Sequence, residues 1–257
     1  MTDVLGTCTA WGDGVCVIEP ESGAAVTIDL ADIVSGKPVP PRPSARHRIS
    51  PLQAQLHGLH LWPDLETEPV GDWLLRSSPT ESARRANSVL AFVPPRVDDA
   101  YERVVAHYDR PIAAVLPDSA EDELFRSRGW VMESHHADAL FQIAGVAQVR
   151  RALPTPGPSV ELVDLGPGVV TARIADLATG VAAYDDDWVG FRSLDVDPGH
   201  RRRGLGLAVM ATLLAWGAEH GATTAYLQVR VDNEPALALY TRLGFTTHHA
   251  YRYLAAP

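Results

Sequence analysis

The chain has 257 residues, of which 46% are hydrophobic and 21% charged, and its formal net charge is −10 at pH 7. This composition is typical of folded globular proteins, excludes fibrous and disordered classes, and at this length allows two or three domains. No apolar run approaches the roughly 20 residues needed to span a bilayer. The first residues also lack a basic region followed by an apolar stretch, so we expect a cytoplasmic protein with no membrane partner. The negative charge opposes binding to phosphate backbones, and nucleic acid is not an expected partner.

The first part of the chain, residues 1–40, alternates apolar and polar side chains in three short runs typical of strands. These runs are residues 5–10, 15–18 and 25–28, with glycine-containing turns between them, and they predict a miniature β-barrel. Both cysteines, Cys8 and Cys16, fall in this stretch. We expect reduced, half-buried thiols there, because a chain without an export signal stays in a reducing compartment. A proline-rich segment at residues 37–43 predicts a semi-rigid linker.

The middle region, residues 51–151, mixes helical and strand patterns. The predicted helices cover residues 51–61 and 100–107, and a third short helix is stopped by Gly129 and followed by another strand. Predicted strands cover residues 73–76, 88–92 and 112–116. A second group of prolines, at residues 154–158, separates this region from the rest of the chain.

The last region, residues 158–257, has the clearest pattern. Its predicted strands are residues 169–177, 180–184, 188–196, 224–230 and 245–254, and its predicted helices are residues 204–220 and 234–243. Hairpins followed by crossover helices predict a mixed sheet in an α/β sandwich.

One segment of this region, Leu194–Ala208, has a pattern suited to binding phosphate. A strand ends at Pro198, and a basic turn containing glycine then opens a long helix. Free amides and the dipole at a helix start attract anions, and glycine lets the backbone approach the ligand closely. A P-loop is excluded because its lysine and hydroxyl are absent, and the glycine spacing differs from a dinucleotide-binding fingerprint. The turn therefore predicts a pyrophosphate site.

The same block resembles the signature of the GNAT superfamily of acyl-CoA-dependent N-acetyltransferases, which is Arg or Gln, two residues, Gly, one residue, and Gly or Ala. Arg201, Gly204 and Gly206 match it, and residues 233–245 resemble the second signature of that family. The resemblance covers roughly residues 169–254. It implies an α/β (α+β) GNAT fold with a mixed central sheet flanked by helices. It also implies acetyl-CoA as co-substrate, no metal, and direct attack of a primary amine on the thioester.

The resemblance implies roles for individual residues. The backbone of residues 194–196 would pair with the pantetheine arm, the amides of residues 202–207 would hold the pyrophosphate, and Tyr240 would protonate the leaving thiolate. The implied cofactor-binding residues are Leu194, Asp195, Val196, Arg201, Arg202, Arg203, Gly204, Leu205, Gly206, Leu207, Asn233 and Tyr240. Four of them also have structural interpretations. Tyr240 could be a core aromatic residue, Asn233 a helix N-cap, and Arg202 and Arg203 part of a solvated turn.

The group that removes the proton from the amine is less clearly indicated. Many GNAT relatives place a glutamate on the strand before the phosphate turn, where this chain has Gly190. The candidates here are Asp195, Asp187 and the pair His248–His249. We take Asp195, together with Tyr240, as the predicted catalytic residues.

The middle region looks like a degenerate GNAT half, because it lacks an arginine-glycine turn. The two halves together resemble tandem GNAT proteins of actinobacterial type, some of which carry an SH3-like module in front. This resemblance implies an SH3-like module (1–40), a degenerate half (51–151) and a catalytic half (158–257), with the acceptor site between the halves. Five middle-region residues could line that site, although a structural role is the simpler interpretation for each of them. They are Trp73, Arg76, Arg84, Arg85 and Asn87.

The acceptor and the oligomeric state are left open by the sequence. The acceptor could be an amine-bearing small molecule or a protein lysine. Two other functions are compatible with the same residues. The chain could be a non-catalytic acyl-CoA sensor, or its first module could bind a peptide or nucleic acid and bring the enzyme to it.

Overall fold

The computed structural model describes residues 4, 6–20, 23–36, 45–153 and 160–257. The chain divides into two compact units, residues 1–43 and 44–257. The predicted linker at 37–43 and the prolines at 154–158 both lie outside the described residues. None of the helices in the described part of the chain has the length and apolar character that crossing a bilayer requires.

The N-terminal unit contains a three-stranded antiparallel sheet. Its strands are β1 (Thr7–Gly12), β2 (Val15–Glu19) and β3 (Val26–Asp29), in the order β1-β2-β3, and a short 3-10 helix η1 (Leu30–Asp32) follows. Cys16 is buried and Cys8 is exposed, and their unbonded Sγ atoms lie 3.7 Å apart. The three predicted strands are therefore present. Closure of this sheet into a barrel stays a prediction.

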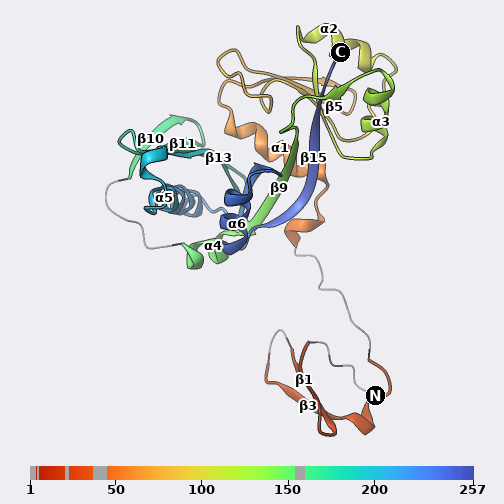
Figure 1. The fold of residues 1–257 in the computed structure, drawn as a ribbon, viewed down its shortest axis with the longest axis vertical. Helices are drawn as coiled ribbons and strands as arrows, with labels where there is room; N and C mark the ends of the chain where they lie inside the picture. The colour runs from red at the N-terminus through yellow and green to blue at the C-terminus, as the bar shows by residue number, and fades with distance from the viewer. Residues whose placement is uncertain (1–3, 5, 21–22, 37–44, 154–159) are drawn as a thin grey trace. The chain divides into compact units, whose positions relative to one another are not determined.

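The larger unit is built on one mixed sheet (Figure 1). Its strands are β4 (Glu66–Val70), β5 (Trp73–Ser77), β6 (Val89–Ala91), β7 (Ile112–Val115), β8 (Val131–Met132), β9 (Asp138–Gly145), β10 (Glu161–Gly166), β11 (Val169–Ile174), β12 (Ala178–Asp185), β13 (Trp188–Val196), β14 (Thr224–Arg230) and β15 (Thr246–Ala255). Its helices are η2 (Ala45–Arg48), α1 (Pro51–His57), η3 (Gly58–Leu61), α2 (Ala100–His107), α3 (Ala120–Ser127), α4 (Val146–Ala152), η4 (Pro198–His200), α5 (Leu205–Glu219) and α6 (Glu234–Arg242).

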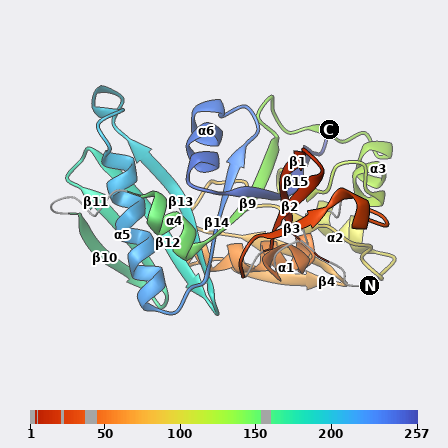
Figure 2. The same cartoon turned by 90° about the horizontal axis from the view of Figure 1, so that it is seen from below.

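The middle and C-terminal regions exchange strands at the centre of this sheet. The order is β10-β11-β12-β13-β14-β9-β15-β7-β6-β5-β4, and β8 pairs with β15. Strand β9 of the middle region thus lies between β14 and β15 (Figure 2), while the last strand, β15, pairs with β7 of the middle region. The two regions therefore share one continuous set of backbone hydrogen bonds.

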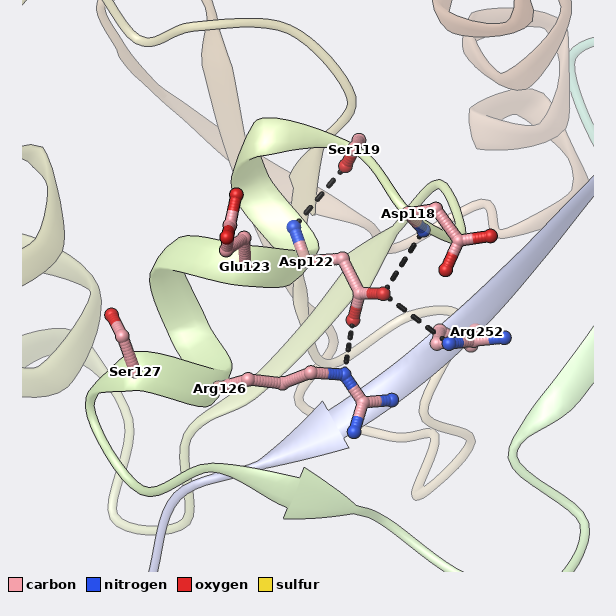
Figure 3. Close-up of a pocket in the computed structure, with 7 residues that line it drawn as sticks. All are labelled: Asp118, Ser119, Asp122, Glu123, Arg126, Ser127 and Arg252. Carbon is pink, nitrogen blue, oxygen red and sulfur yellow. Dashed lines mark hydrogen bonds and ion pairs between the residues drawn. The ribbon is translucent and has the colours of Figure 1, made fainter.

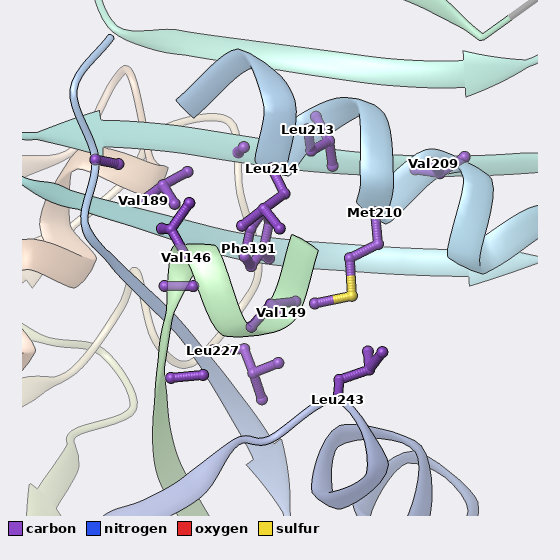
Figure 4. Close-up of a cluster of buried hydrophobic side chains, with 14 of the residues drawn as sticks. Val146, Val149, Val189, Phe191, Val209, Met210, Leu213, Leu214, Leu227 and Leu243 are labelled. Atoms are coloured by element: carbon purple, nitrogen blue, oxygen red, sulfur yellow. The ribbon is translucent and has the colours of Figure 1, made fainter. Parts of the chain in front are cut away.

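Helix α5 covers one face of the C-terminal part of the sheet (Figure 2). Its residues Met210, Leu213 and Leu214 pack with Phe191 of β13 and Val149 of α4 in a buried apolar cluster (Figure 4). Burying each such side chain stabilises the fold by about 1.5–3 kcal/mol. This core fixes α5, and so its first turn, against the end of β13.

The opposite face is covered by α1 and η3. The helix predicted for residues 51–61 is divided into these two elements. A capping box begins α1, because the Gln53 amide donates to Ser50 Oγ at 3.2 Å and the Ser50 amide donates to Gln53 Oε1 at 2.9 Å. Leu61 and Trp62 then pack into a cluster with Tyr226 of β14. The middle region is thereby held against the strands that carry the predicted site.

Candidate functional site

Strands β13 and β14 separate halfway along their length. They pair in parallel from Trp188 with Thr224 to Phe191 with Leu227. Beyond Phe191, no described strand pairs with β13 on the β14 side, although Asp195 and Val196 still pair with β12 on the other side. The backbone of the predicted residues Leu194, Asp195 and Val196 therefore has one edge open to an extended ligand.

A β-bulge lies where the two strands part. The register of β12 with β13 shifts between Thr179 and Val181, and Ser193 has a φ of +53°. A positive φ is uncommon for a residue other than glycine, and a bulge bends and twists the strand that contains it. The bulge therefore accounts for the divergence of β13 from β14.

The turn after β13 is shaped by Asp197. Its Oδ1 accepts hydrogen bonds from His200 Nδ1 at 2.7 Å and from the Gly199 amide at 3.0 Å. The hydrogen bond from His200, aided by that of the Gly199 amide, holds the pKa of Asp197 below its ordinary value. The Arg201 Nε donates to the Val196 carbonyl at 3.2 Å, which ties the next segment back to the strand.

Residues 201–207, the glycine turn, form an open helix start. Gly204 is the N-cap of α5 with a φ of +82°, and none of the described side chains caps the helix. A Cβ on Gly204 would meet nothing within 4 Å, whereas a Cβ on Gly206 would lie 3.2 Å from Val196 Cγ2. Free helical amides and the helix dipole attract an anion.

Three exposed arginines, Arg201, Arg202 and Arg203, lead into this helix start. Within the described residues, no carboxylate forms an ion pair with Arg202 or Arg203. The first helical residues, Leu205 and Leu207, are half-buried against the core. The predicted phosphate-binding residues thus lie together, and the described part of the chain holds no ion-pair partner for the charges of Arg202 and Arg203.

Asn233 lies at the start of α6 as its N-cap, and Tyr240 lies within the helix. Asn233 is the N-cap, since its Oδ1 accepts a hydrogen bond from the Ala236 amide at 3.3 Å, which leaves its side-chain NH₂ available to donate. Tyr240 packs edge-on against Phe245, with 5.8 Å between ring centroids. Among the described residues its hydroxyl has no hydrogen-bond partner. Burial raises the pKa of this phenol.

Position 190 cannot hold a side chain in this fold. A Cβ built on Gly190 would lie 2.1 Å from Cζ of Tyr226, which fills the space next to it. The Tyr226 hydroxyl is fixed there by a 2.7 Å hydrogen bond to the His57 carbonyl, and burial raises its pKa. The buried phenol ring of Tyr226 therefore occupies the space that the side chain of a catalytic base at position 190 would need.

Asp187 and Asp195 lie at opposite ends of β13. Asp187 Oδ2 accepts a 2.6 Å hydrogen bond from Thr223 Oγ1 at the start of the strand. At about 3.3 Å per residue it lies roughly 30 Å from the end of the strand, too far to act at the open edge. Asp195 is exposed at that edge. Leu194 and Val196 point toward α5, so Asp195 between them points to the opposite face.

The histidine pair is held neutral by a chain of hydrogen bonds. The Ile49 carbonyl can only accept, so His248 Nε2 donates to it at 3.1 Å and His248 Nδ1 accepts from His249 Nδ1 at 2.8 Å. His249 Nε2 then accepts from the Gln55 amide at 3.2 Å. Burial, together with the neighbouring His248, lowers the pKa of His249 to about 3. His249 is therefore too weak a base to take a proton near neutral pH.

A segment of the middle region, residues 78–87, reaches the separated strands. Glu81 Oε1 lies 3.2 Å from Arg192 Nη2, and Arg85 Nε donates to Gln228 Oε1 at 3.0 Å. Arg192 also stacks on Trp62, with its Cζ 4.3 Å from the ring centroid. Of these residues, the sequence indicated Arg85 but not Glu81, Arg192 or Gln228. Alternation along β14 was the available signal, since it puts Gln228 on the same face as Tyr226.

The other middle-region candidates have structural roles. Trp73 is buried and donates to the Val93 carbonyl at 2.7 Å, and buried Arg76 binds the Ser88 carbonyl and hydroxyl at 3.1 and 2.8 Å. Asn87 bonds backbone groups of its own loop. Arg84 pairs with Glu133 at 2.5 Å and covers the Tyr253 ring. Arg85 is the one of the five whose side chain bonds a residue at the open part of β14.

A separate hollow of about 780 Å³ lies beside α3 (Figure 3). At its centre the buried carboxylate of Asp122 accepts hydrogen bonds from Arg126 at 2.8 Å, Arg252 at 3.2 Å and the Asp118 amide at 3.1 Å. All these charges are paired with one another, which indicates a structural network. Among the described residues, no three acidic, histidine or cysteine side chains are arranged to hold a metal ion.

Comparison with known proteins links this site to an enzyme family. Residues 158–254 match the family model described as "Probable histone acetyltransferase Rv0428c C-terminal". The whole chain is 24% identical to the probable histone acetyltransferase Rv0428c of Mycobacterium tuberculosis (strain ATCC 25618 / H37Rv), of which the alignment covers 89%. A segment of 77 residues is 34% identical to the uncharacterized N-acetyltransferase YobR of Bacillus subtilis (strain 168). That segment covers 29% of this chain and 31% of YobR.

Solved structures share the fold. A GCN5-related N-acetyltransferase from Kribbella flavida matches with a TM-score of 0.55 at 15% identity, over 79% of this chain and 95% of that one. A tandem GNAT protein from the clavulanic acid biosynthesis pathway matches with a TM-score of 0.50 at 13% identity, over 76% of this chain and 84% of that one. At such low identity these matches show the fold alone.

The larger unit, a mixed sheet whose paired strands part beside an open, basic helix start, has the GNAT-like α/β fold. The match to residues 158–254 and the full-length relative agree with this fold class. Residues 158–254 are similar to acetyltransferases, and the names of the relatives indicate an acyltransferase.

The closed space at position 190 gives a first prediction. We expect Gly190→Ala to lower the free energy of unfolding by about 1–3 kcal/mol, because the added methyl group overlaps the Tyr226 ring. Urea unfolding measures the change, and Gly12→Ala is the control, since a Cβ there meets nothing within 4 Å. The loss should shrink when Gly190→Ala is combined with Tyr226→Leu. Additive losses in the double variant would contradict the assigned overlap.

Proposed function

We propose that this chain transfers the acetyl group of acetyl-CoA directly to a primary amine. The observation that carries the proposal is the uncapped helix start at Gly204, flanked by unpaired arginines and adjoining the open edge of β13. A pyrophosphate would bind at the uncapped helix start, and the amide groups of a pantetheine arm would pair with the open edge of β13. The proposed cofactor-binding residues are Leu194, Asp195, Val196, Arg201, Arg202, Arg203, Gly204, Leu205, Gly206, Leu207, Asn233 and Tyr240.

We place a single cofactor site in the C-terminal half and treat the middle region as a degenerate half. Helix α3 of the middle region and helix α6 of the C-terminal half end in the same way. After α3 the Trp130 amide donates to the Phe125 carbonyl at 3.1 Å, and after α6 the Phe245 amide donates to the Tyr240 carbonyl at 2.9 Å. Phe125, which is fully buried, therefore stands where the C-terminal half has Tyr240. Helix α2 follows Asp99 rather than a glycine turn, and a carboxylate there would repel a phosphate.

The proposed chemistry needs two proton transfers. The acceptor loses a proton, its nitrogen attacks the thioester carbonyl, and the carbon–sulfur bond breaks to give an amide and a thiolate. Tyr240 would supply a proton to the sulfur, since its hydroxyl is neutral and unbonded among the described residues. Asp195 would take the proton from the amine, directly or through water, because it lies on the open edge with its side chain directed away from α5.

The acceptor is an amine-bearing small molecule or a protein lysine. The name of the full-length relative, a probable histone acetyltransferase, describes a protein substrate for that relative. The N-terminal sheet would then serve as an SH3-like adapter that binds the partner, and we propose a cytoplasmic location. A non-catalytic acyl-CoA sensor is the alternative, favoured by the absence of a side chain at Gly190. Thiol release from acetyl-CoA in the presence of amines separates the two, because a sensor binds the cofactor without releasing thiol.

Cofactor binding at the glycine turn is tested by Gly204→Ala. The φ of Gly204 is strained for alanine, and the new methyl group projects into the open space at the helix start. We expect acetyl-CoA binding, measured by calorimetry, to weaken about tenfold or more as amide contacts to phosphate are lost. Gly129→Ala is the control, because its φ of +87° imposes the same strain, about 1–2 kcal/mol, far from the turn. Equal affinities of the two variants would disprove the assigned site.

The role of Tyr240 is tested by Tyr240→Phe. We expect kcat for thiol release to fall about 100-fold or more while the melting temperature stays unchanged, since the hydroxyl has no partner among the described residues. Tyr184→Phe, which removes another hydroxyl without a described partner, should keep full activity. Because burial raises the pKa of Tyr240, the phenol keeps its proton above the ordinary value of about 10, and the alkaline loss of activity should begin above that pH.

The role of Asp195 is tested by Asp195→Asn. We expect kcat/KM for the amine to fall about 100-fold with acetyl-CoA affinity unchanged, because only proton removal is lost. Asp187→Asn is the matched control at the other end of β13. Full activity of Asp195→Asn would show that another group, or solvent alone, accepts the proton.

A further inference from the structure

Arg85 is a half-buried cation whose described partners are all neutral. Its Nε donates to Gln228 Oε1 at 3.0 Å and to the Tyr251 hydroxyl at 3.1 Å, and its Nη2 donates to the Gln228 carbonyl at 3.4 Å. Its Nη1 has no hydrogen-bond partner among the described residues. The amide of Gln228 is itself held in place by a hydrogen bond from Tyr251 to the same Oε1 atom. The guanidinium is therefore fixed in position, with one terminal NH₂ group unused.

The neighbouring arginines differ in this respect. Arg84 forms an ion pair with Glu133 at 2.5 Å, and Arg192 forms one with Glu81 at 3.2 Å. No carboxylate of the described residues lies within 4 Å of Arg85. Removing a guanidinium from water is costly unless an anion compensates it. Arg85 thus lacks the counter-ion that each of these two neighbours has.

Arg85 lies where the separated strands are open. Gln228, its main partner, is the first residue of β14 beyond the part that pairs with β13. Its side chain is on the same face as Tyr226, opposite the face that α5 covers. Asp195 points to that face as well. An acceptor approaching the thioester from there would pass Arg85.

Arg76 is an arginine with a structural role, and it differs from Arg85 in exposure and in the place of its partners. Among the described residues it also has no carboxylate partner, but only 4% of it is exposed, and it is bonded to Ser88, which directly precedes the neighbouring strand β6. Arg85 is more exposed and bridges from the middle region to β14. A fork-shaped guanidinium with a free NH₂ group is suited to pairing with a carboxylate.

We infer that Arg85 binds a carboxylate of the acceptor, so that the substrate is a small amine carrying a carboxylate close to its amino group, as in an amino acid. This inference rests on the proposed transfer function and makes its acceptor specific. A lysine within a protein chain has no such carboxylate beside its amine and would leave Arg85 unpaired. The acceptor would lie with its carboxylate on Arg85 and its amine over the open edge of β13.

The test uses pairs of acceptors that differ only in the carboxylate. A panel of amino acids is compared with the amines formed by removing the carboxylate from each, and lysine-containing peptides with blocked ends are added. Thiol release from acetyl-CoA gives kcat/KM for each compound. We expect at least one amino acid to exceed its decarboxylated counterpart about 100-fold in the natural chain, in line with the strength of a charge-assisted pair.

The variant Arg85→Gln should abolish this preference. We expect kcat/KM for the amino acid to fall about 100-fold, chiefly through a higher KM, while the value for the decarboxylated amine stays unchanged. Arg85→Lys should recover part of the loss, because it restores the charge but not the fork. Arg84→Gln is the control for charge in the same segment, and its ratio between the two acceptors should equal that of the natural chain.

Each outcome has a distinct meaning. If decarboxylated amines or blocked lysine peptides react as well as amino acids, or if Arg85→Gln lowers both members of a pair equally, the carboxylate inference is overturned while the transferase function stands. If no amine of any kind releases thiol although calorimetry shows acetyl-CoA bound, the transferase function is overturned, and the inference with it.

Discussion

The separation of β13 from β14 is the constraint on which the rest of the site depends. Two parallel strands inside a sheet normally satisfy each other's backbone groups along their whole length, and leaving them unpaired is costly. Here the pairing stops at Phe191, and the bulge at Ser193 turns β13 away. A ligand with amide groups of its own can complete the missing ladder. The turn fixed by Asp197 then brings the uncapped start of α5 to the end of this open edge.

The exchanged strands make the middle region part of the same site. Because β9 lies between β14 and β15, and β15 pairs with β7, neither region can move without breaking the sheet of the other. The segment 78–87 is consequently held over the separated strands, where Arg85 reaches Gln228 and Glu81 neutralises Arg192. The middle region thus contributes side chains beside the separated strands without needing a cofactor site of its own. It positions charge at the place where an acceptor would lie.

The sequence predicted features that depend on neighbouring residues, and missed those that depend on distant ones. Helix α2 and strands β13 and β14 have the predicted bounds, because their periodicity and capping residues are local. Strands β4, β9 and β10 and helix α4 were missed, and so was the strand exchange, since the partners of β9 lie about a hundred residues away. The glycine turn could be predicted because a phosphate-binding helix start is a local pattern. The Glu81–Arg192 pair could not, because nothing near either residue indicates the other.

The same bulge also decides which side chains face the acceptor side of the sheet. Phe191 points toward α5 and Arg192 toward Trp62, so strict alternation would direct Asp195 toward α5. The extra residue at Ser193 shifts the alternation by one. Leu194 and Val196 then point toward α5, and Asp195 points to the side of Arg192 and Gln228. Gly190, on that same side, is blocked by Tyr226. One irregular residue therefore leaves an edge of β13 open where we propose that the cofactor binds. The same residue turns the carboxylate of Asp195 toward the side proposed for the acceptor, whereas position 190 on that side has no room for a side chain.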